Sequence, residues 1–217
     1  MSGGRMGVER MDEARRAAVR QAVGVSVATG LYGISFGALA VAAGLTVWQT
    51  AALSALMFSG ASQFAVVGVI GAGGSAVAAV ASAGLLGVRN GLYGLQDGPL
   101  LRARGWRRVL AAQLTIDEST AVAAAQTDRD AARAGFWWAG AGVFVLWNAL
   151  TLVGALAGNA MGDPKAWGLD AAAAAAFLGL LWPRLGDAPA RAAAGLAAGI
   201  ALVLVPLTPP GVPVLGA

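Results

Sequence analysis

The chain has 217 residues, of which 58% are hydrophobic and 12% are charged, and its mean hydropathy is +0.69. Soluble domains carry about 25% charged residues. This composition argues against a water-soluble protein, and we expect a lipid bilayer as the solvent. Cysteine and histidine are both absent, which excludes disulfides, thiolate chemistry and histidine-based metal sites, and we expect neither a cofactor nor a metal. The net charge of +4 comes from arginines clustered between apolar runs, which indicates membrane topology rather than nucleic-acid binding.

The first segment, residues 1–20, is polar and rich in arginine. The apolar run that follows, Ala22 to Ala43, is longer than the apolar core of a typical secretory signal peptide, which has about 7–15 residues. We therefore expect an uncleaved first membrane helix with its N-terminus in the cytoplasm. Its hydroxyl groups can bond within the helix, and the spacing of Gly33 and Gly37 favours close packing against another helix.

The second apolar run, Trp48 to Ile70, is interrupted by the sequence Ser59-Gly60-Ala61-Ser62-Gln63-Phe64. Helical spacing puts Ser59, Ser62 and Gln63 on one face, and an amide in an apolar helix needs a partner. One interpretation is a polar contact between helices. The other is a helix broken at Gly60, whose freed backbone groups bind a ligand together with Ser62 and Gln63.

The third run, Ala76 to Leu95, contains Arg89 and Asn90 inside a glycine-rich apolar sequence. A charge at mid-depth in a membrane costs several kcal/mol, so we expect Arg89 to face a protein interior or a watery cavity. The string Gly-Leu-Tyr-Gly occurs at residues 30–33 and again at 91–94. This recurrence is either the trace of an internal repeat, which is common in transporters, or chance.

The short loop from Asp97 to Arg108 contains four arginines, so the positive-inside rule predicts that it is cytoplasmic. With a cytoplasmic N-terminus, three full crossings would instead place this loop outside the cell. The loop returns to the cytoplasm if the second run is re-entrant and folds back near Gly60. The alternative is that the rule does not hold at this loop.

The fourth segment, Val109 to about Gln126, is only moderately apolar. In one continuous helix Gln113, Asp117 and Thr120 would share a face. One interpretation is a surface helix outside the bilayer, in which Asp117 and Glu118 are ordinary solvated acids. The other is a buried acidic site that faces Arg89.

Three more apolar runs follow, at residues 136–160, 169–182 and 192–205. In the first of them Gly154 and Gly158 form another close-packing pair. The sequence therefore predicts an all-α, polytopic membrane bundle of six to seven apolar segments, with one broken or re-entrant helix near Gly60. In domain terms we expect a cytoplasmic segment (1–20), a membrane transporter domain (21–207) and a short tail (208–217).

Several local motifs match a known family in order and spacing. The strongest are Gly60-Ala61-Ser62-Gln63-Phe64, the stretch from Arg89 to Gly94, and Thr115-Ile116-Asp117-Glu118; weaker ones are Phe36-Gly37 and Gly168-Leu169-Asp170. On these residues the chain resembles the AzlC family, the large subunit of bacterial branched-chain amino acid exporters, over nearly its whole length.

The resemblance implies a multi-pass transporter of the inner (plasma) membrane. It would export branched-chain or related hydrophobic amino acids together with a small AzlD-like membrane subunit. The family often reads Asn-x-Arg-His around the arginine, whereas this chain has Gly87 and Asn90 at those positions. A titrating histidine is therefore absent from this position of the chain.

An amino acid zwitterion needs donors for its carboxylate and acceptors for its ammonium group. The backbone from Gly60 to Gln63, or Arg89, would hold the carboxylate, and Asp117 or Glu118 would hold the ammonium or exchange a proton. Ser62, Gln63 and Asn90 complete the set of candidate substrate-binding residues. A second interpretation is that Arg89 and the carboxylates pair only with each other, as a folding pair. Two other functions stay open, namely a membrane-embedded enzyme and a passive channel that uses the same cluster; we expect a transporter rather than an enzyme.

Overall fold

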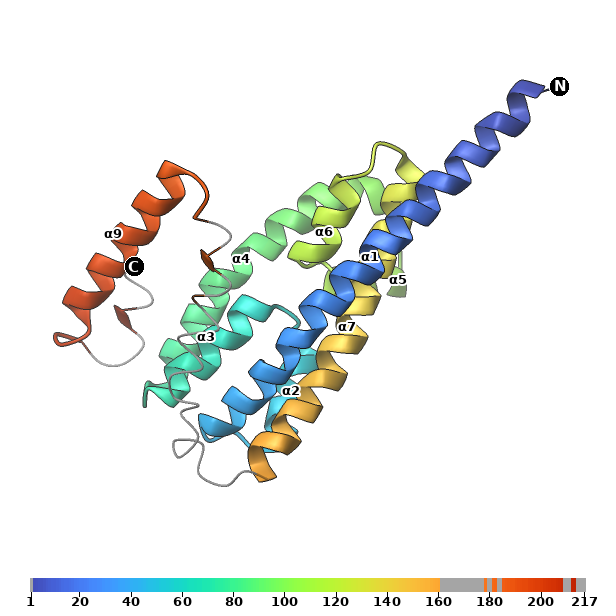
Figure 1. Ribbon diagram of the computed structural model, residues 1–217. Coiled ribbons are helices and arrows are strands. Elements are labelled where there is room, and N and C mark those ends of the chain that lie inside the picture. Colours follow the sequence, from blue (N-terminus) through green and yellow to red (C-terminus); the bar gives the residue numbers. More distant parts are fainter. Residues whose placement is uncertain (1, 161–177, 179–180, 183–184, 209–211, 214–217) are drawn as a thin grey trace. The chain divides into compact units, whose positions relative to one another are not determined.

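The computed structural model of the chain describes residues 2–160, 178, 181–182, 185–208 and 212–213. All secondary-structure elements in these ranges are helices (Figure 1), so the prediction of an all-α protein is confirmed. The predicted sixth run, residues 169–182, lies almost wholly outside the described residues, as does the Gly168-Leu169-Asp170 motif. The helices are α1 (Ser2–Ala42), α2 (Val47–Leu56), α3 (Gly60–Gly71), α4 (Ala76–Leu101), α5 (Trp106–Gln113), α6 (Asp117–Ala124), α7 (Arg129–Ala160) and α9 (Ala188–Leu204).

Three of the described helices are long and apolar enough to cross a membrane: Met11–Ala42 of α1, the whole of α4, and α7. Even the shortest of them, α4, has 26 residues and is about 39 Å long at 1.5 Å per residue, against a hydrocarbon core of about 30 Å. α9 is a shorter apolar helix of 17 residues. The described residues thus confirm a membrane protein with three candidate spans, and they do not confirm six or seven.

The second and fourth apolar runs are each divided into two short helices. α2 and α3 are separated by residues 57–59, which confirms the predicted break near Gly60. α5 and α6 are separated by residues 114–116, so the prediction of one continuous helix through the fourth run is wrong. Ser119 accounts for this second break, because its hydroxyl donates to the carbonyl of Leu114 (2.7 Å) and accepts the amide of Ile116 (3.1 Å).

The helices fall into two compact units, which are described separately. The first unit comprises Met1–Gly33, Ser54–Ser59 and Val88–Leu150, and the second comprises Ile34–Leu53, Gly60–Gly87 and Thr151–Ala217. α1, α4 and α7 each contribute residues to both units. The first unit contains α5, α6 and the break before α3, and the second contains α3 and α9.

In the first unit α1 packs against α7 through small residues. A Cβ atom built on Gly30 would lie 2.7 Å from the Cβ of Leu146, and one built on Gly142 would overlap the hydroxyl of Ser26. That hydroxyl donates to the carbonyl of Ala22 (2.7 Å), as the sequence predicted for a serine in an apolar helix. Small side chains at this contact let the two helices approach closely without a polar cost.

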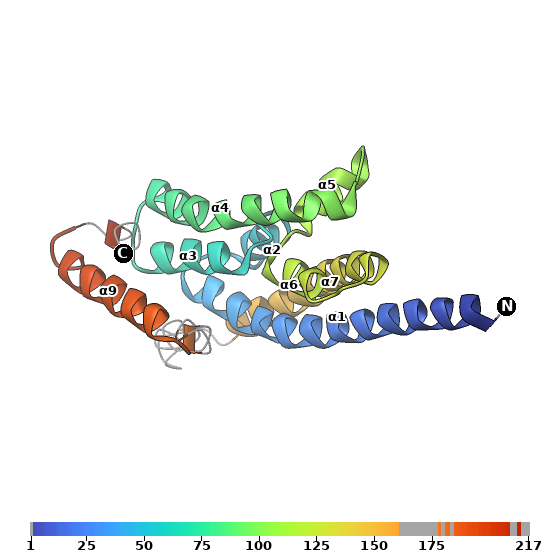
Figure 2. The ribbon, with the colours of Figure 1, turned by 90° about the horizontal axis from the view of Figure 1, so that it is seen from above.

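In the second unit the same two helices approach even more closely. A Cβ atom on Gly37 would overlap the main-chain carbonyl of Thr151, and one on Gly154 would overlap that of Ile34. The predicted close packing at Gly37 and Gly154 is therefore confirmed. α3 lies beside the first half of α4 in this unit (Figure 2), and its N-terminal end is fixed there by the hydrogen bond from Ser62 to the carbonyl of Ala83 (3.0 Å).

Candidate functional site

The centre of the candidate site is an ion pair between two helices of the first unit. Arg89 lies at the middle of α4, and its Nη1 atom is 3.1 Å from Oδ2 of Asp117, the first residue of α6. Both side chains are partly buried, with 30% and 24% of their surface exposed. The carboxylate also lies at the N-terminus of α6, where the helix dipole stabilises negative charge. The predicted juxtaposition of Arg89 with the acidic pair is therefore confirmed.

Glu118 is the second acid of the site, and it has a different partner. The hydroxyl of Thr29 on α1 donates to Oε1 of Glu118 at 3.4 Å. Not every hydroxyl of the first helix bonds only within that helix, because a carboxylate in the first turn of α6 lies within reach of Thr29. Three helices, α1, α4 and α6, therefore contribute to one polar cluster inside the first unit.

On α4, two buried polar atoms of adjacent residues have no hydrogen-bond partner among the residues that the structure describes. They are the Nε donor of Arg89 and the Oδ1 acceptor of Asn90. An unsatisfied buried polar group costs about 1–3 kcal/mol. A donor and an acceptor without partners thus lie on adjacent residues of α4.

The short helix α6 is tied to α4 at a second point. The Thr120 hydroxyl donates to Oδ2 of Asp97 at 2.7 Å, and Asp97 is only 3% exposed. Gln113, which the sequence placed on one face with Asp117 and Thr120, belongs instead to α5, and its Nε2 atom donates to the carbonyl of Ala55 at 2.9 Å. The shared face is not formed because the break at residues 114–116 reorients the chain between Gln113 and Asp117.

The other predicted site residues, Gly60, Ser62 and Gln63, belong to the second unit. Gly60 is the first residue of α3, as the broken-helix interpretation predicted. Ser62 and Gln63 are buried, and the Ser62 hydroxyl bonds to the carbonyl of Ala83 on α4, as the interpretation of a polar contact between helices predicted. Each interpretation of this stretch thus describes part of it, and a role in binding substrate stays a prediction.

The amino-acid sequence of the chain matches a known family. The AzlC protein family matches residues 24–161, which is more than half of the chain. The chain belongs to the AzlC family. The matched range contains all seven predicted site residues, from Gly60 to Glu118. No curated protein and no solved structure matches the chain.

Membership of the AzlC family associates the chain with membrane transport of amino acids, and with transporters rather than enzymes. AzlC proteins function with a partner subunit. Among the described residues, no group of three or more carboxylate side chains is placed to hold a metal ion. The cluster on α1, α4 and α6 consists of an ion pair, a second carboxylate and a hydroxyl group.

Sequence reasoning missed two residues that make polar contacts with α6. Thr29 gave no signal, since a single threonine in an apolar helix most often bonds to its own helix. Asp97 was assigned to the loop that follows the third run, whereas it lies inside α4. An acid eight residues after Arg89 in the same apolar segment was the available signal, because a buried carboxylate needs a partner.

Proposed function

We propose that this chain is the substrate-carrying subunit of an inner-membrane transporter that exports branched-chain or related hydrophobic amino acids together with a small AzlD-like subunit. The observation that supports this most is the pairing of Arg89 with Asp117 beside Glu118, halfway along an apolar helix. Every α-amino acid carries one carboxylate and one ammonium group, and this cluster presents a partner for each. The preference for hydrophobic side chains and the identity of the subunit rest on the family resemblance.

The substrate binds by separating the ion pair. Its carboxylate takes the place of Asp117 on the guanidinium of Arg89, where the unpaired Nε and a terminal nitrogen together offer a two-pronged donor. Its ammonium group pairs with the carboxylate of Asp117 and donates a further hydrogen bond to Oδ1 of Asn90. One ion pair is replaced by two, so the charges of Arg89 and Asp117 stay compensated both with and without substrate.

The test measures export from cells loaded with a leucine- or valine-containing dipeptide, which releases the free amino acid inside. We expect faster appearance of that amino acid outside only when the chain and its candidate small partner are produced together. Arg89→Ala and Asp117→Asn should each reduce this export at least tenfold, because each removes one of the two charges that hold the zwitterion. The amount of each variant in the membrane is measured alongside by immunoblotting.

Matched controls are available on two other helices of the first unit. Asp130→Asn changes an acid of α7 that is 65% exposed and pairs with Arg133, and Arg16→Ala removes an exposed arginine of α1. Both should export at the wild-type rate. Full export by both site variants would contradict the site, and no export of any hydrophobic amino acid by the wild type would contradict the substrate assignment.

A further inference from the structure

The two broken segments of the chain are built and connected in the same way. Four residues link α1 to α2 (43–46), and four link α4 to α5 (102–105). The breaks inside the two segments, 57–59 and 114–116, have three residues each. The final links are again equal, with four residues before α4 (72–75) and four before α7 (125–128). The order of a long helix, a short helix, a break and a second short helix thus occurs twice.

Individual residues repeat as well. The third residue of α3 is Ser62 and the third residue of α6 is Ser119; both are buried, and both hydroxyls donate to a main-chain carbonyl. The two Gly-Leu-Tyr-Gly strings, at residues 30–33 and 91–94, lie in α1 and α4, the equivalent long helices. They end nine and seven residues before the ends of those helices (33 against 42, and 94 against 101). This agreement favours an internal repeat over chance.

The first broken segment returns to the point from which it starts. In the second unit a Cβ atom on Gly71, the last residue of α3, would lie 3.3 Å from the Cβ of Ala43, the residue directly after α1. α2 has 10 residues and α3 has 12, so they are about 15 and 18 Å long, roughly half of the 30 Å hydrocarbon core. Neither helix is therefore long enough to cross the hydrocarbon core, and the two ends of the segment lie close together.

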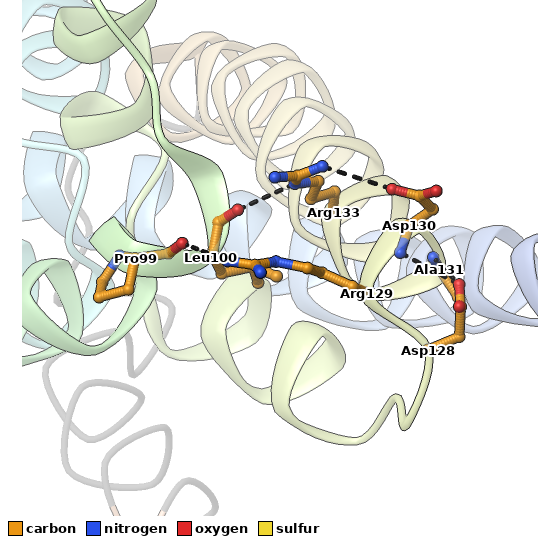
Figure 3. A network of polar contacts seen from close by, with 7 residues as sticks. All are labelled: Pro99, Leu100, Asp128, Arg129, Asp130, Ala131 and Arg133. Carbon is orange, nitrogen blue, oxygen red and sulfur yellow. Dashed lines mark hydrogen bonds and ion pairs between the residues drawn. The ribbon is translucent and has the colours of Figure 1, made fainter.

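The second broken segment also returns to its start, in the first unit (Figure 3). Nη2 of Arg129 donates to the carbonyl of Pro99 at 2.7 Å, and Nε of Arg133 donates to that of Leu100 at 2.9 Å. These two bonds hold the beginning of α7 beside the end of α4. α5 and α6 have eight residues each and are about 12 Å long, which again is too short to cross the hydrocarbon core.

We infer that the chain contains an inverted repeat, in which α1–α3 and α4–α6 are two copies of one unit whose re-entrant hairpins enter the membrane from opposite faces. Each copy has a single full crossing, so the second copy runs through the membrane in the opposite direction to the first. The hairpin α2–α3 then starts from the outer face and α5–α6 starts from the cytoplasmic face. The inference holds whatever the substrate is.

The distribution of charge agrees with this topology. It places the arginines of residues 5–20, 102–108 and 129–133 at one face, and the links 43–46 and 72–75 at the other face contain no charged residue. The positive-inside rule makes the arginine-rich face cytoplasmic. The rule is therefore satisfied by all three arginine-rich segments at once, which three full crossings before residue 102 would prevent.

The tips of the two hairpins meet in the first unit. Gln113, the last residue of α5, donates its hydrogen bond to the carbonyl of Ala55, one residue before the end of α2. Asp117 and Glu118 follow directly on the other side of the α5–α6 break. The polar cluster is thus next to the point where a hairpin from one face touches a hairpin from the other, which is where inverted-repeat transporters place their binding sites.

The test uses the fact that the chain has no cysteine, so each single substitution introduces the sole thiol. Thr46→Cys and Ala72→Cys mark the two ends of the first hairpin, and Arg104→Cys and Thr127→Cys mark those of the second; all four positions are exposed. A membrane-impermeant maleimide is applied to right-side-out and to inside-out membrane vesicles. Labelling after denaturation verifies that each thiol is present, and Arg16→Cys is the cytoplasmic reference.

We expect Thr46→Cys and Ala72→Cys to be labelled in right-side-out vesicles, and Arg104→Cys, Thr127→Cys and Arg16→Cys in inside-out vesicles. Opposite sidedness within either hairpin pair would show that this segment crosses the membrane and would overturn the inference. Labelling of both pairs from the same face would overturn the inversion. Because the measurement involves no substrate, it decides the topology even where the export experiment gives no signal.

Discussion

At the scale of single residues, the question is whether Arg89 and Asp117 form a folding pair or a pair that substrate separates. A folding pair depends on attraction between the two charges, whereas a binding pair also depends on which helix carries which charge. The two cases predict different results for a charge reversal, which keeps the attraction and exchanges the positions.

We expect Arg89→Asp and Asp117→Arg, made singly, to lower both export and the amount of protein in the membrane, because each replaces an attracting pair of opposite charges by two like charges. The double variant should regain the wild-type amount of protein and export less than a tenth as much amino acid. Dipeptide-loaded cells and immunoblotting provide both values. Wild-type export by the double variant would identify the pair as purely structural.

Thr29 provides a second test at this scale, since its hydroxyl donates to Glu118 at 3.4 Å. Thr29→Val keeps the shape of the side chain and removes the donor, and hydrogen bonds to charged groups contribute about 1.5–3 kcal/mol. We expect export to fall roughly tenfold, the lower end of that range, with an unchanged amount of protein. Thr29→Ser keeps the hydroxyl and should stay close to wild type; equal export by the valine and serine variants would show that Glu118 does not need this donor.

At the scale of elements, the close contact of α1 with α7 in the second unit limits the size of the side chains that can stand at this contact. A side chain at Gly37 would overlap the main chain at Thr151, which cannot move without displacing the helix. Gly24 is also on α1, and a Cβ atom there would meet nothing within 4 Å. The two glycines thus form a matched pair, one in close contact and one in open space.

Ordinary overpacking of a core costs about 1–3 kcal/mol. We expect Gly37→Leu to destabilise the protein by more than this, because the new side chain would overlap main-chain atoms. Each kcal/mol corresponds to a fall of about 2–4 °C in Tm for a chain of this length. The measurement is the melting temperature of the purified protein in detergent, with Gly24→Leu as the control. Equal melting temperatures for the two variants would contradict the packing described for the second unit.

One of the two helix breaks could be predicted from the sequence and the other could not. The break before Gly60 was predicted because glycine, serine and glutamine interrupt an apolar run at that point. The break at residues 114–116 was not, since Leu114, Thr115 and Ile116 fit an apolar helix and the decisive bonds come from Ser119, three to five residues later. The available signal was the acid pair at 117–118, because acids are typical of a first helical turn.

At the scale of the whole molecule, hydropathy identified the apolar runs but left their number of crossings open. An apolar run of about 23 residues has the same composition whether it crosses the membrane or turns back at its centre, since both forms meet the same solvent. The arginines of residues 102–108 carried the missing information, because they conflict with an odd number of crossings. The sequence thus predicted the polar pair and gave re-entrance of the first broken segment as one of two interpretations, while the return of the second segment depends on the bonds from Arg129 and Arg133.

Those two bonds have a consequence for the evolution of the chain. Their acceptors are the main-chain carbonyls of Pro99 and Leu100, which every amino acid supplies. The side chains at 99 and 100 are therefore free to vary as far as this contact is concerned, whereas the donors must stay arginine or a close substitute. When either arginine is lost, no substitution at residue 99 or 100 can compensate, because the acceptor is a main-chain carbonyl. Second-site suppressors should therefore arise elsewhere in the chain. Residues 99 and 100 should show no covariation with residues 129 and 133.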